Sequence, residues 1–226
     1  MNLLVLGKGK MGSVVIELAR QRGHHVEAHD EFDNPHARML TPERLQTIDV
    51  VCDFTWPGAV VENVVACAVA GKNLVVGTTG WYDRLDYVRE QVAASGIGLI
   101  YGANFSLGIN LFFEICRAAA PALQRGFSGS ITETHHIHKK DAPSGTALRL
   151  QAVLEEAGAV KTPIESIREG EVFGIHELRL ESAGETIVLS HTAKSRAALA
   201  EGTLRAAEWL QGKHGFYEFK DIWREV

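Results

Sequence analysis

The stretch NLLVLGKGKMGSVVIELARQRG, residues 2–23, decides the fold. Residues 2–6 form an apolar run that ends at a glycine, which is typical of a buried strand in a parallel sheet. The apolar positions of residues 11–23 then recur at helical spacing, and Gly23 marks the end of a helix. A strand, a glycine-rich turn and a helix in this order predict the first unit of a parallel α/β sheet.

Strand and helix patterns continue to alternate along the first half of the chain. Further apolar strands are expected within residues 24–30, 49–54, 73–80 and 96–106. Helical patterns separate the later strands, at residues 59–71 and 83–96. This alternation predicts an α/β fold with a Rossmann-type, doubly wound parallel sheet.

The pattern changes after Asn104. Helices are expected over residues 107–126, 144–158 and 196–212, with a strand over 128–139. Residues 164–193 have the pattern of antiparallel strands, with turns at REGE and SAGE. We therefore expect a smaller α+β domain at residues 105–193. Residues 1–104 and about 194–226 would form the first domain, and the apolar face of the last helix would cover the first sheet.

Composition narrows the class of protein. The chain has 226 residues, 46% of them hydrophobic, and a net charge of −5, which allows one large core or two modest ones. Its basic residues are scattered, which argues against nucleic acid as the main partner. Cys52, Cys67 and Cys116 lie in apolar surroundings and are expected to be buried, reduced thiols. No stretch has the pattern of a signal peptide or a membrane span, so we expect a soluble, cytoplasmic protein.

The motif Gly7-x-Gly9-x-x-Gly12 predicts a dinucleotide site. Gly7 permits a tight turn, Gly9 lets a phosphate approach the backbone, and Gly12 allows the helix and the strand to pack closely. The N-terminus of the helix would then face the pyrophosphate. Asp30 ends the second strand about 20 residues further on, where a carboxylate accepts hydrogen bonds from ribose hydroxyls. The alternative is an ordinary glycine-rich turn.

The choice between the two dinucleotides stays open. Asp30 and Glu31 would repel a 2′-phosphate, which favours NADH. Lys8 and Lys10 would offset this repulsion, so use of both NADH and NADPH is possible.

Two further segments end parallel strands on the side where ligands bind. They are GTTG, residues 77–80, and GANFS, residues 102–106. Their small residues and their Thr and Asn side chains could approach a nicotinamide ribose. The alternative is that both serve only as turns.

A second motif, ETHHIHKKDAPSGTA at residues 133–147, allows three interpretations. As a strand that runs into a loop, it has His136 and His138 on one face and His135 on the other. It could be a solvated strand end, or a zinc site, since a His-x-His pair can chelate zinc. The further ligands at hand would be Asp141 and Glu133. A zinc site needs three or four ligands and no cysteine is near, so we predict no metal.

The third interpretation is an acid/base and anion-binding site. The sequence DAPSGTA has Pro143, Ser144, Gly145 and Thr146 at the start of a helix, where free N–H groups and hydroxyls can bind a carboxylate. An imidazole that titrates near neutrality and a neighbouring lysine can transfer a proton or neutralise a developing anion. This combination suits a small acidic substrate.

The motifs together resemble those of the 4-hydroxy-tetrahydrodipicolinate reductases, traditionally called dihydrodipicolinate reductases. The segments that carry the resemblance are HHIHKKDAPSGTA, GKGKMG, GTTG, ANFSLGIN and HTAKSRAALAEGTLRAAEWL. They span nearly the whole chain, and the first is the most specific. The chain is short for the family. Glu31 stands where longer members often carry an arginine, which leaves the preference for NADP open.

The resemblance implies NAD(P)H-dependent reduction of 4-hydroxy-tetrahydrodipicolinate in lysine and diaminopimelate biosynthesis. It implies a dinucleotide-binding domain, a substrate-binding and oligomerisation domain, and a homotetramer. The implied catalytic residues are His135 and Lys139. The implied substrate-binding residues are His136, Lys139, Ser144, Gly145 and Thr146. The implied cofactor-binding residues are Gly7, Lys8, Gly9, Lys10, Met11, Gly12, Asp30, Gly77, Thr78, Thr79, Gly102, Ala103, Asn104 and Phe105.

The expected chemistry is hydride transfer to a dicarboxylate heterocycle, assisted by a proton from Lys139 or His135. Closure of the two domains would bring the reactants together. The alternatives are another Rossmann oxidoreductase of a small carboxylate, an NADH-binding redox regulator and a zinc hydrolase. An acylating semialdehyde dehydrogenase needs a nucleophilic cysteine, and none of the three lies in a polar loop near the histidines. A DNA-binding regulator needs a basic recognition helix, which the sequence lacks.

Overall fold

The computed structural model describes all residues, 1–226, and divides them into two compact units. The first unit comprises Met1–Leu107 and Ala197–Val226, and the second comprises Gly108–Arg196. None of the helices combines the length and the apolar character that crossing a lipid bilayer requires.

A parallel sheet of six strands forms the centre of the first unit. Its strands are β1 (Asn2–Leu6), β2 (His25–His29), β3 (Val50–Asp53), β4 (Asn73–Val76), β5 (Gly98–Tyr101) and β10 (Gly215–Glu218). They lie in the order β10-β5-β4-β3-β1-β2, and all neighbours are parallel. The order reverses between β1 and β3, so the crevice at the carboxyl ends of these strands is the expected ligand position.

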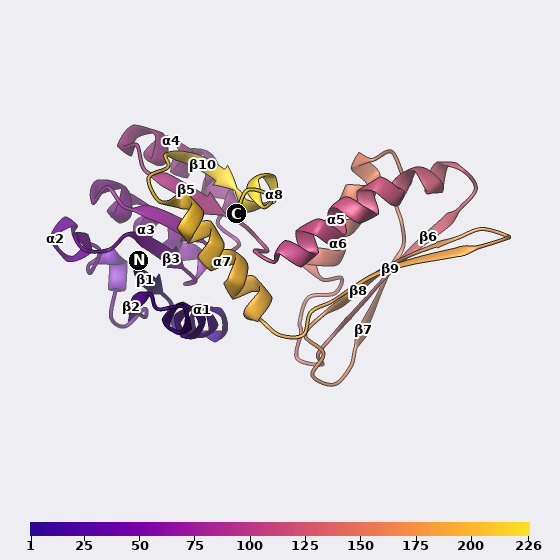
Figure 1. The fold of residues 1–226 in the computed structure, drawn as a ribbon, viewed down its shortest axis with the longest axis horizontal. Coiled ribbons are helices and arrows are strands. Elements are labelled where there is room, and N and C mark those ends of the chain that lie inside the picture. Colours follow the sequence, from indigo (N-terminus) through magenta and orange to yellow (C-terminus); the bar gives the residue numbers. More distant parts are fainter. The chain divides into compact units, whose positions relative to one another are not determined.

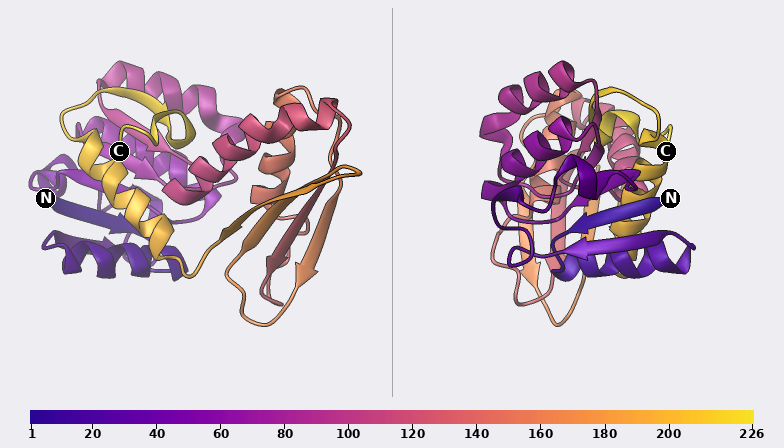
Figure 2. Two further views of the ribbon diagram at one scale, coloured as in Figure 1. Left: turned by 45° about the vertical axis from the view of Figure 1, so that its right-hand side comes forward. Right: turned by 90° about the vertical axis from the view of Figure 1, so that its left-hand side faces the viewer.

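Helices cover both faces of this sheet (Figures 1 and 2). They are α1 (Lys10–Gln21), α2 (Pro42–Leu45), α3 (Pro57–Val69), α4 (Leu85–Ser95), α7 (Ala197–Leu210) and α8 (Phe219–Ile222), with short 3-10 turns η1 (Pro35–Ala37) and η2 (Tyr82–Arg84). Successive strand residues point to opposite faces. Leu3 and Val5 therefore pack in the core under α1 and α7, whereas Leu4 and Leu6 pack in the core under α3 and α4. The predicted doubly wound sheet is confirmed.

The C-terminal tail adds a strand that the sequence did not reveal. Helix α7 packs against β3, β4 and β5, as its apolar face indicates. Residues 215–218 then pair with β5 as the edge strand β10. All four of its residues are only partly buried. Their sequence, GFYE, contains no continuous apolar run from which a strand could have been predicted.

The second unit is a mixed sheet with two helices on one face (Figure 1). Its strands are β6 (Ser128–His135), β7 (Ile164–Arg168), β8 (Ile175–Glu181) and β9 (Thr186–Thr192), in the order β7-β6-β8-β9. Its helices are α5 (Leu107–Ala119) and α6 (Gly145–Glu156), and η3 (Ala120–Gln124) follows α5. Ile131, Leu178 and Leu180 face the helices and form the core with residues such as Phe112 and Leu150.

Two predictions for this unit are wrong in part. β8 and β9 do form an antiparallel hairpin at SAGE, but β7 pairs in parallel with β6, so REGE is not a hairpin turn. α6 connects the two parallel strands, as parallel pairing requires. The strand expected over 128–139 ends at His135, because the backbone N–H groups of His136 and Ile137 donate to Val172 and Gly170 in a neighbouring loop. The two-faced alternation expected for His136 and His138 therefore does not apply.

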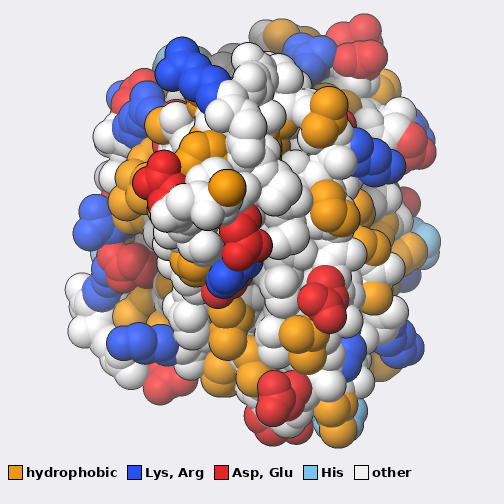
Figure 3. Space-filling view, turned by 90° about the vertical axis from the view of Figure 1, so that its right-hand side faces the viewer, with side chains coloured by type: hydrophobic (Ala, Val, Ile, Leu, Met, Phe, Trp, Pro, Cys, Tyr) orange, Lys and Arg blue, Asp and Glu red, His pale blue; other side chains and the backbone are white.

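The other face of the four-stranded sheet carries no helix of its own unit. Its side chains include Thr132, Glu177 and Arg179, and Ile167 and Val188 are exposed there. In the view of Figure 3, hydrophobic side chains lie among acidic and basic ones, and neither charge dominates.

The three cysteines are buried and free, as predicted. Burial raises the thiol pKa of Cys52 and Cys116 to about 12, and it also raises that of Cys67. They therefore remain protonated packing residues at neutral pH.

Candidate active site

The glycine motif forms a tight turn between β1 and α1. Gly7 has φ +88°, and a Cβ there would lie 2.4 Å from the carbonyl oxygen of Phe54. A Cβ at Gly12 would lie 1.8 Å from the carbonyl oxygen of Gly7, so helix and strand could not approach as they do. Gly9 has no heavy atom within 4 Å of its Cβ position and leaves the N-terminus of α1 accessible. These positions fit a dinucleotide cradle.

A pocket of about 600 Å³ lies beside this turn. Its lining residues include Leu6, Gly7, Gly9, His29, Asp30, Glu31, Phe54, Thr55, Trp56 and Asn63. They come from the carboxyl ends of β1, β2 and β3 and from α3, which is the switch point of the sheet. One oxygen of Asp30 accepts the backbone N–H of Glu31 at 3.0 Å. Asp30, the carboxylate predicted to bind the ribose hydroxyls, thus lines this pocket.

The side chain of Lys8 is paired with Asp33, an acidic residue that follows β2 shortly after Asp30. Its Nζ donates to Asp33 at 2.7 Å, and the backbone N–H of Asp30 donates to the same Asp33 oxygen at 3.1 Å. The hydrogen bond to Asp33 raises the pKa of Lys8, and the bond from Lys8 lowers the pKa of Asp33. The ammonium group of Lys8 is therefore already paired.

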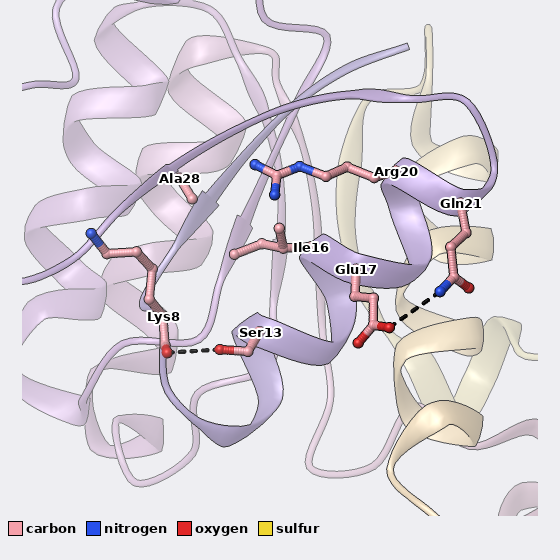
Figure 4. Close-up of a pocket in the computed structure, with 7 residues that line it drawn as sticks. All are labelled: Lys8, Ser13, Ile16, Glu17, Arg20, Gln21 and Ala28. Atoms are coloured by element: carbon pink, nitrogen blue, oxygen red, sulfur yellow. Dashed lines mark hydrogen bonds between the residues drawn. The ribbon is translucent and has the colours of Figure 1, made fainter.

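A second hollow, of about 460 Å³, lies along the outer side of α1 (Figure 4). Its lining residues are Lys8, Ser13, Ile16, Glu17, Arg20, Gln21 and Ala28. Ser13 donates to the carbonyl oxygen of Lys8 at 2.8 Å, and Gln21 donates to Glu17 at 3.2 Å. The first contact lies at the start of α1 and the second at its end, and we assign no ligand to this hollow.

The ends of β4 and β5 lie at the same edge of the sheet as the glycine turn but outside the pocket of 600 Å³. Thr78 is buried and donates to Asp53 at 3.0 Å, so its hydroxyl is used within the fold, whereas Thr79 is exposed. Phe105 packs on Phe219 in the core, with ring centroids 4.7 Å apart. Only the backbone of these two buried residues is suited to face a cofactor. Ala103, by contrast, is exposed.

Asp53 is a buried residue that the sequence interpretation did not single out. Its carboxylate accepts hydrogen bonds from Thr55, Asn63 and Thr78, at distances between 2.6 and 3.0 Å. It therefore ties the end of β3 to α3 and to the segment after β4. The signal for it was an acid at the end of a fully apolar strand.

The second motif forms a polar cluster on the helix-facing side of the second sheet. Glu133 is fully buried, and its Oε1 accepts from Arg168 at 2.8 Å and from the backbone N–H of Ser144 at 3.2 Å. Its Oε2 forms a short hydrogen bond with Nδ1 of His135. Burial would raise the pKa of Glu133, but hydrogen bonds, led by that from Arg168, lower it to about 2. The carboxylate is therefore ionised at neutral pH.

His135 is 8% exposed, and its Nδ1 is the nitrogen that faces Glu133. Burial lowers its pKa below the usual range, against the opposing effect of the Glu133 carboxylate. A neutral imidazole beside an ionised carboxylate donates from Nδ1, which leaves Nε2 as the free acceptor. The Nε2 atom lies 3.0 Å from the Cβ position of Gly174, so only a glycine fits against it.

His176 adds a second buried imidazole. It is 5% exposed, and its ring meets that of His135 edge to face at 5.1 Å. Ser144 Oγ accepts from the backbone N–H of Ala147, so its own proton is available for Nε2 of His176 at 3.2 Å. Burial, assisted by His135, lowers the pKa of His176 to about 4. Its Nδ1 is buried without a partner.

Lys139 and the start of α6 lie next to this cluster in the chain. Lys139 donates to Asp141 at 2.9 Å. The bond from Lys139 lowers the pKa of Asp141, against burial, and the backbone N–H of Gly145 contributes. Ser144 is the N-cap of α6, and the Cβ position of Gly145 has no neighbour within 4 Å. The lysine and the helix N-terminus thus already hold one carboxylate of the chain.

Glu133, His135 and His176 could offer a carboxylate oxygen and two ring nitrogens within 4.8 Å of one another. Both oxygens of Glu133 and one nitrogen of each imidazole already have hydrogen-bond partners in the chain. We therefore describe a hydrogen-bonded cluster and assign no metal.

The structure brings together His135, Ser144 and two residues that the sequence interpretation missed, Arg168 and His176. Arg168 enters because β7 pairs in parallel with β6 and sets it opposite His135. His176 could have been found, since it shares the apolar face of β8 with Leu178 and Leu180. His138 is exposed, 70% at its side chain, and joins Glu171 rather than the cluster.

Comparison with known proteins gives a consistent result over the whole chain. Residues 1–105 match the family model described as dihydrodipicolinate reductase, N-terminus, and residues 108–223 match the model of its C-terminus.

A curated relative from Christiangramia forsetii, named 4-hydroxy-tetrahydrodipicolinate reductase, is 36% identical over 98% of this chain and 97% of its own. One of the same name from Chromobacterium violaceum is 37% identical, with the same coverage. A solved structure of dipicolinate-bound dihydrodipicolinate reductase from Paenisporosarcina sp. TG-14 has a TM-score of 0.80 at 21% identity, over 98% of this chain and 99% of that one. This last similarity concerns the fold alone.

Proposed function

The chain belongs to the dihydrodipicolinate reductase family, and on that premise we propose how its residues divide the reaction. The enzyme is an NAD(P)H-dependent oxidoreductase that reduces 4-hydroxy-tetrahydrodipicolinate to tetrahydrodipicolinate in lysine biosynthesis. This conversion replaces a ring hydroxyl by hydrogen. It therefore takes up a hydride and a proton and releases water.

The first unit is proposed to bind the cofactor. NAD(P)H supplies the hydride when bound. The N-terminus of α1 would hold the pyrophosphate at Gly9, and Asp30 would accept hydrogen bonds from the adenosine ribose. The close contacts at Gly7 and Gly12 and the open position at Gly9 support this assignment. The segments 77–79 and 102–105 are proposed to complete the cofactor site, in large part through backbone groups.

We propose that NADH is preferred over NADPH. Asp30, Glu31 and Asp33 follow one another at the end of β2, and the ammonium of Lys8 is paired with Asp33. A 2′-phosphate would therefore meet carboxylates and would have to displace Asp33 from Lys8.

The second unit is proposed to bind the substrate and transfer the proton. The substrate carboxylates would accept hydrogen bonds from the backbone N–H groups of Gly145 and Thr146 and from the ammonium of Lys139. They would replace Asp141, which accepts from Lys139 in the structure. His136 and Ser144 would complete the substrate site. Lys139 would donate the proton, and Nε2 of His135 would exchange protons with it or with the substrate. The observation that carries this assignment is the buried Glu133–His135 pair, which leaves one imidazole nitrogen free.

A homotetramer in the cytoplasm completes the proposal. The uncovered face of the second sheet, with Ile167 and Val188 exposed, is the proposed contact between subunits. Light scattering of the purified protein would test it. The three buried thiols suit a reducing compartment.

The test of the function is the initial rate of NADH and NADPH oxidation at 340 nm. The substrate would be generated from pyruvate and aspartate semialdehyde by the preceding condensing enzyme. We expect turnover with a higher kcat/KM for NADH. Absence of turnover with both cofactors would overturn the assigned function, whereas a higher kcat/KM for NADPH would overturn only the preference.

A further inference from the structure

Glu133 is the residue that connects the parts of the second site. One oxygen, Oε1, accepts from Arg168 at 2.8 Å and from the backbone N–H of Ser144 at 3.2 Å. The other, Oε2, faces Nδ1 of His135. The carboxylate therefore links the N-cap of the substrate-binding helix to the imidazole that transfers protons.

This division of the two oxygens fixes the tautomer of His135. An ionised carboxylate only accepts hydrogen bonds, so Nδ1 of His135 must carry the proton that the pair shares. Nε2 has no hydrogen-bond partner in the chain and lies against Gly174, where a side chain would obstruct it. In the opposite tautomer Nε2 would carry a hydrogen, and a neutral ring could not accept a proton there.

Resting on the function proposed above, we propose that Glu133 is a positioning residue, which holds His135 as the Nδ1–H tautomer so that Nε2 is its proton-exchanging atom. Arg168 keeps the carboxylate ionised and in place. Glu133 itself is fully buried, and both of its oxygens have hydrogen-bond partners within the chain. Its effect is exerted through His135.

Glu133→Gln tests this with little change in shape. The amide oxygen can take the position of Oε1 and keep the bonds from Arg168 and Ser144. The amide nitrogen then takes the position of Oε2 and donates to Nδ1 of His135, which forces the proton onto Nε2. A structural role for Glu133 predicts no such exchange of tautomer.

The decisive readout is the 15N spectrum of the histidine side chains in the substrate-free enzyme. His135 should be the Nδ1–H tautomer in the wild type and the Nε2–H tautomer in Glu133→Gln. The kcat of the variant should fall by about 10²–10⁴-fold, the range of general acid–base catalysis, with KM and the Kd for NADH within about threefold. The pH profile of kcat should shift to lower pH in this variant, because the neutral amide no longer stabilises the imidazolium form of His135.

Two further variants make the result unambiguous. Glu133→Asp keeps the acceptor and should restore the Nδ1–H tautomer with part of the activity. Glu155→Gln removes one exposed negative charge from α6 and should change nothing.

The same tautomer in wild type and Glu133→Gln, or full kcat in a Glu133→Gln enzyme whose tautomer has changed, would overturn the proposal. If Glu133→Gln does not fold, an Nε2–H tautomer of His135 in the wild type or in Glu133→Asp would overturn the proposal. An inactive wild type with the expected tautomers would instead refute the proposed function.

Discussion

Alanine at Gly12 and alanine at Gly9 should separate folding from cofactor binding. At Gly12 the new Cβ would lie 1.8 Å from the carbonyl oxygen of Gly7, so the backbone must shift. Overpacking of this kind costs about 1–3 kcal/mol, which for a chain of this size lowers Tm by about 2–12 °C. At Gly9 the new Cβ meets nothing within 4 Å, and the weaker helix cap costs at most about 1 kcal/mol.

The affinity for NADH should show the opposite order, with the larger loss in Gly9→Ala. Gly9 lines the pocket, so its Cβ would stand where pyrophosphate oxygens approach the N–H groups of α1. Loss of one hydrogen bond to a charged group costs about 1.5–3 kcal/mol, or about 10- to 150-fold in Kd. Differential scanning fluorimetry would measure Tm without cofactor, and NADH fluorescence titration would measure Kd. Wild-type NADH affinity in Gly9→Ala, or an unchanged Tm in Gly12→Ala, would refute the reasoning.

Three further predictions concern the second unit. Gly145→Val should raise the substrate KM about tenfold, the loss of about one hydrogen bond, without lowering Tm, since its Cβ meets no neighbour; an unchanged KM in steady-state kinetics would count against the carboxylate site. Arg168→Met should lower the free energy of unfolding in urea by about 3–5 kcal/mol, because it leaves the Glu133 carboxylate buried without its cation; a loss below about 1 kcal/mol would contradict the ion pair. The free energy of unfolding should fall as pH drops from 6.5 towards 4, because the unfolded chain protonates His176 before the folded chain does. His176→Phe should lose this part of the pH dependence. The measurement is the urea midpoint at several pH values, and an equal change of the midpoint with pH in both proteins would contradict the prediction.

The first sheet was predictable because its sequence signals are local. Residues 3–6 are apolar and buried, and Gly7 must adopt a positive φ, so the strand and the turn follow from the residue types. The edge strand β10 gave no such signal. Its residues 215–218 are only partly buried, and they pair with β5, more than 100 residues earlier in the chain.

The second unit shows what local patterns do not determine. The turn at REGE resembles a hairpin turn, but β7 pairs in parallel with β6, and only this pairing sets Arg168 opposite His135. The motif at 133–147 indicated acid/base chemistry and an anion site. It did not reveal that Glu133 would be buried behind His135, because that position depends on Arg168 and Ser144. His176 was visible in principle as a histidine on the apolar face of β8.

The central claim is that the second unit supplies protons and the first unit binds the cofactor. The most direct test measures kcat and the Kd for NADH in His135→Ala, Lys139→Ala and the double variant. Each single change should lower kcat by about 10²–10⁴-fold, while the Kd for NADH should stay at the wild-type value in all three proteins. Full turnover in the double variant, or loss of NADH binding that parallels the loss of kcat, would contradict it.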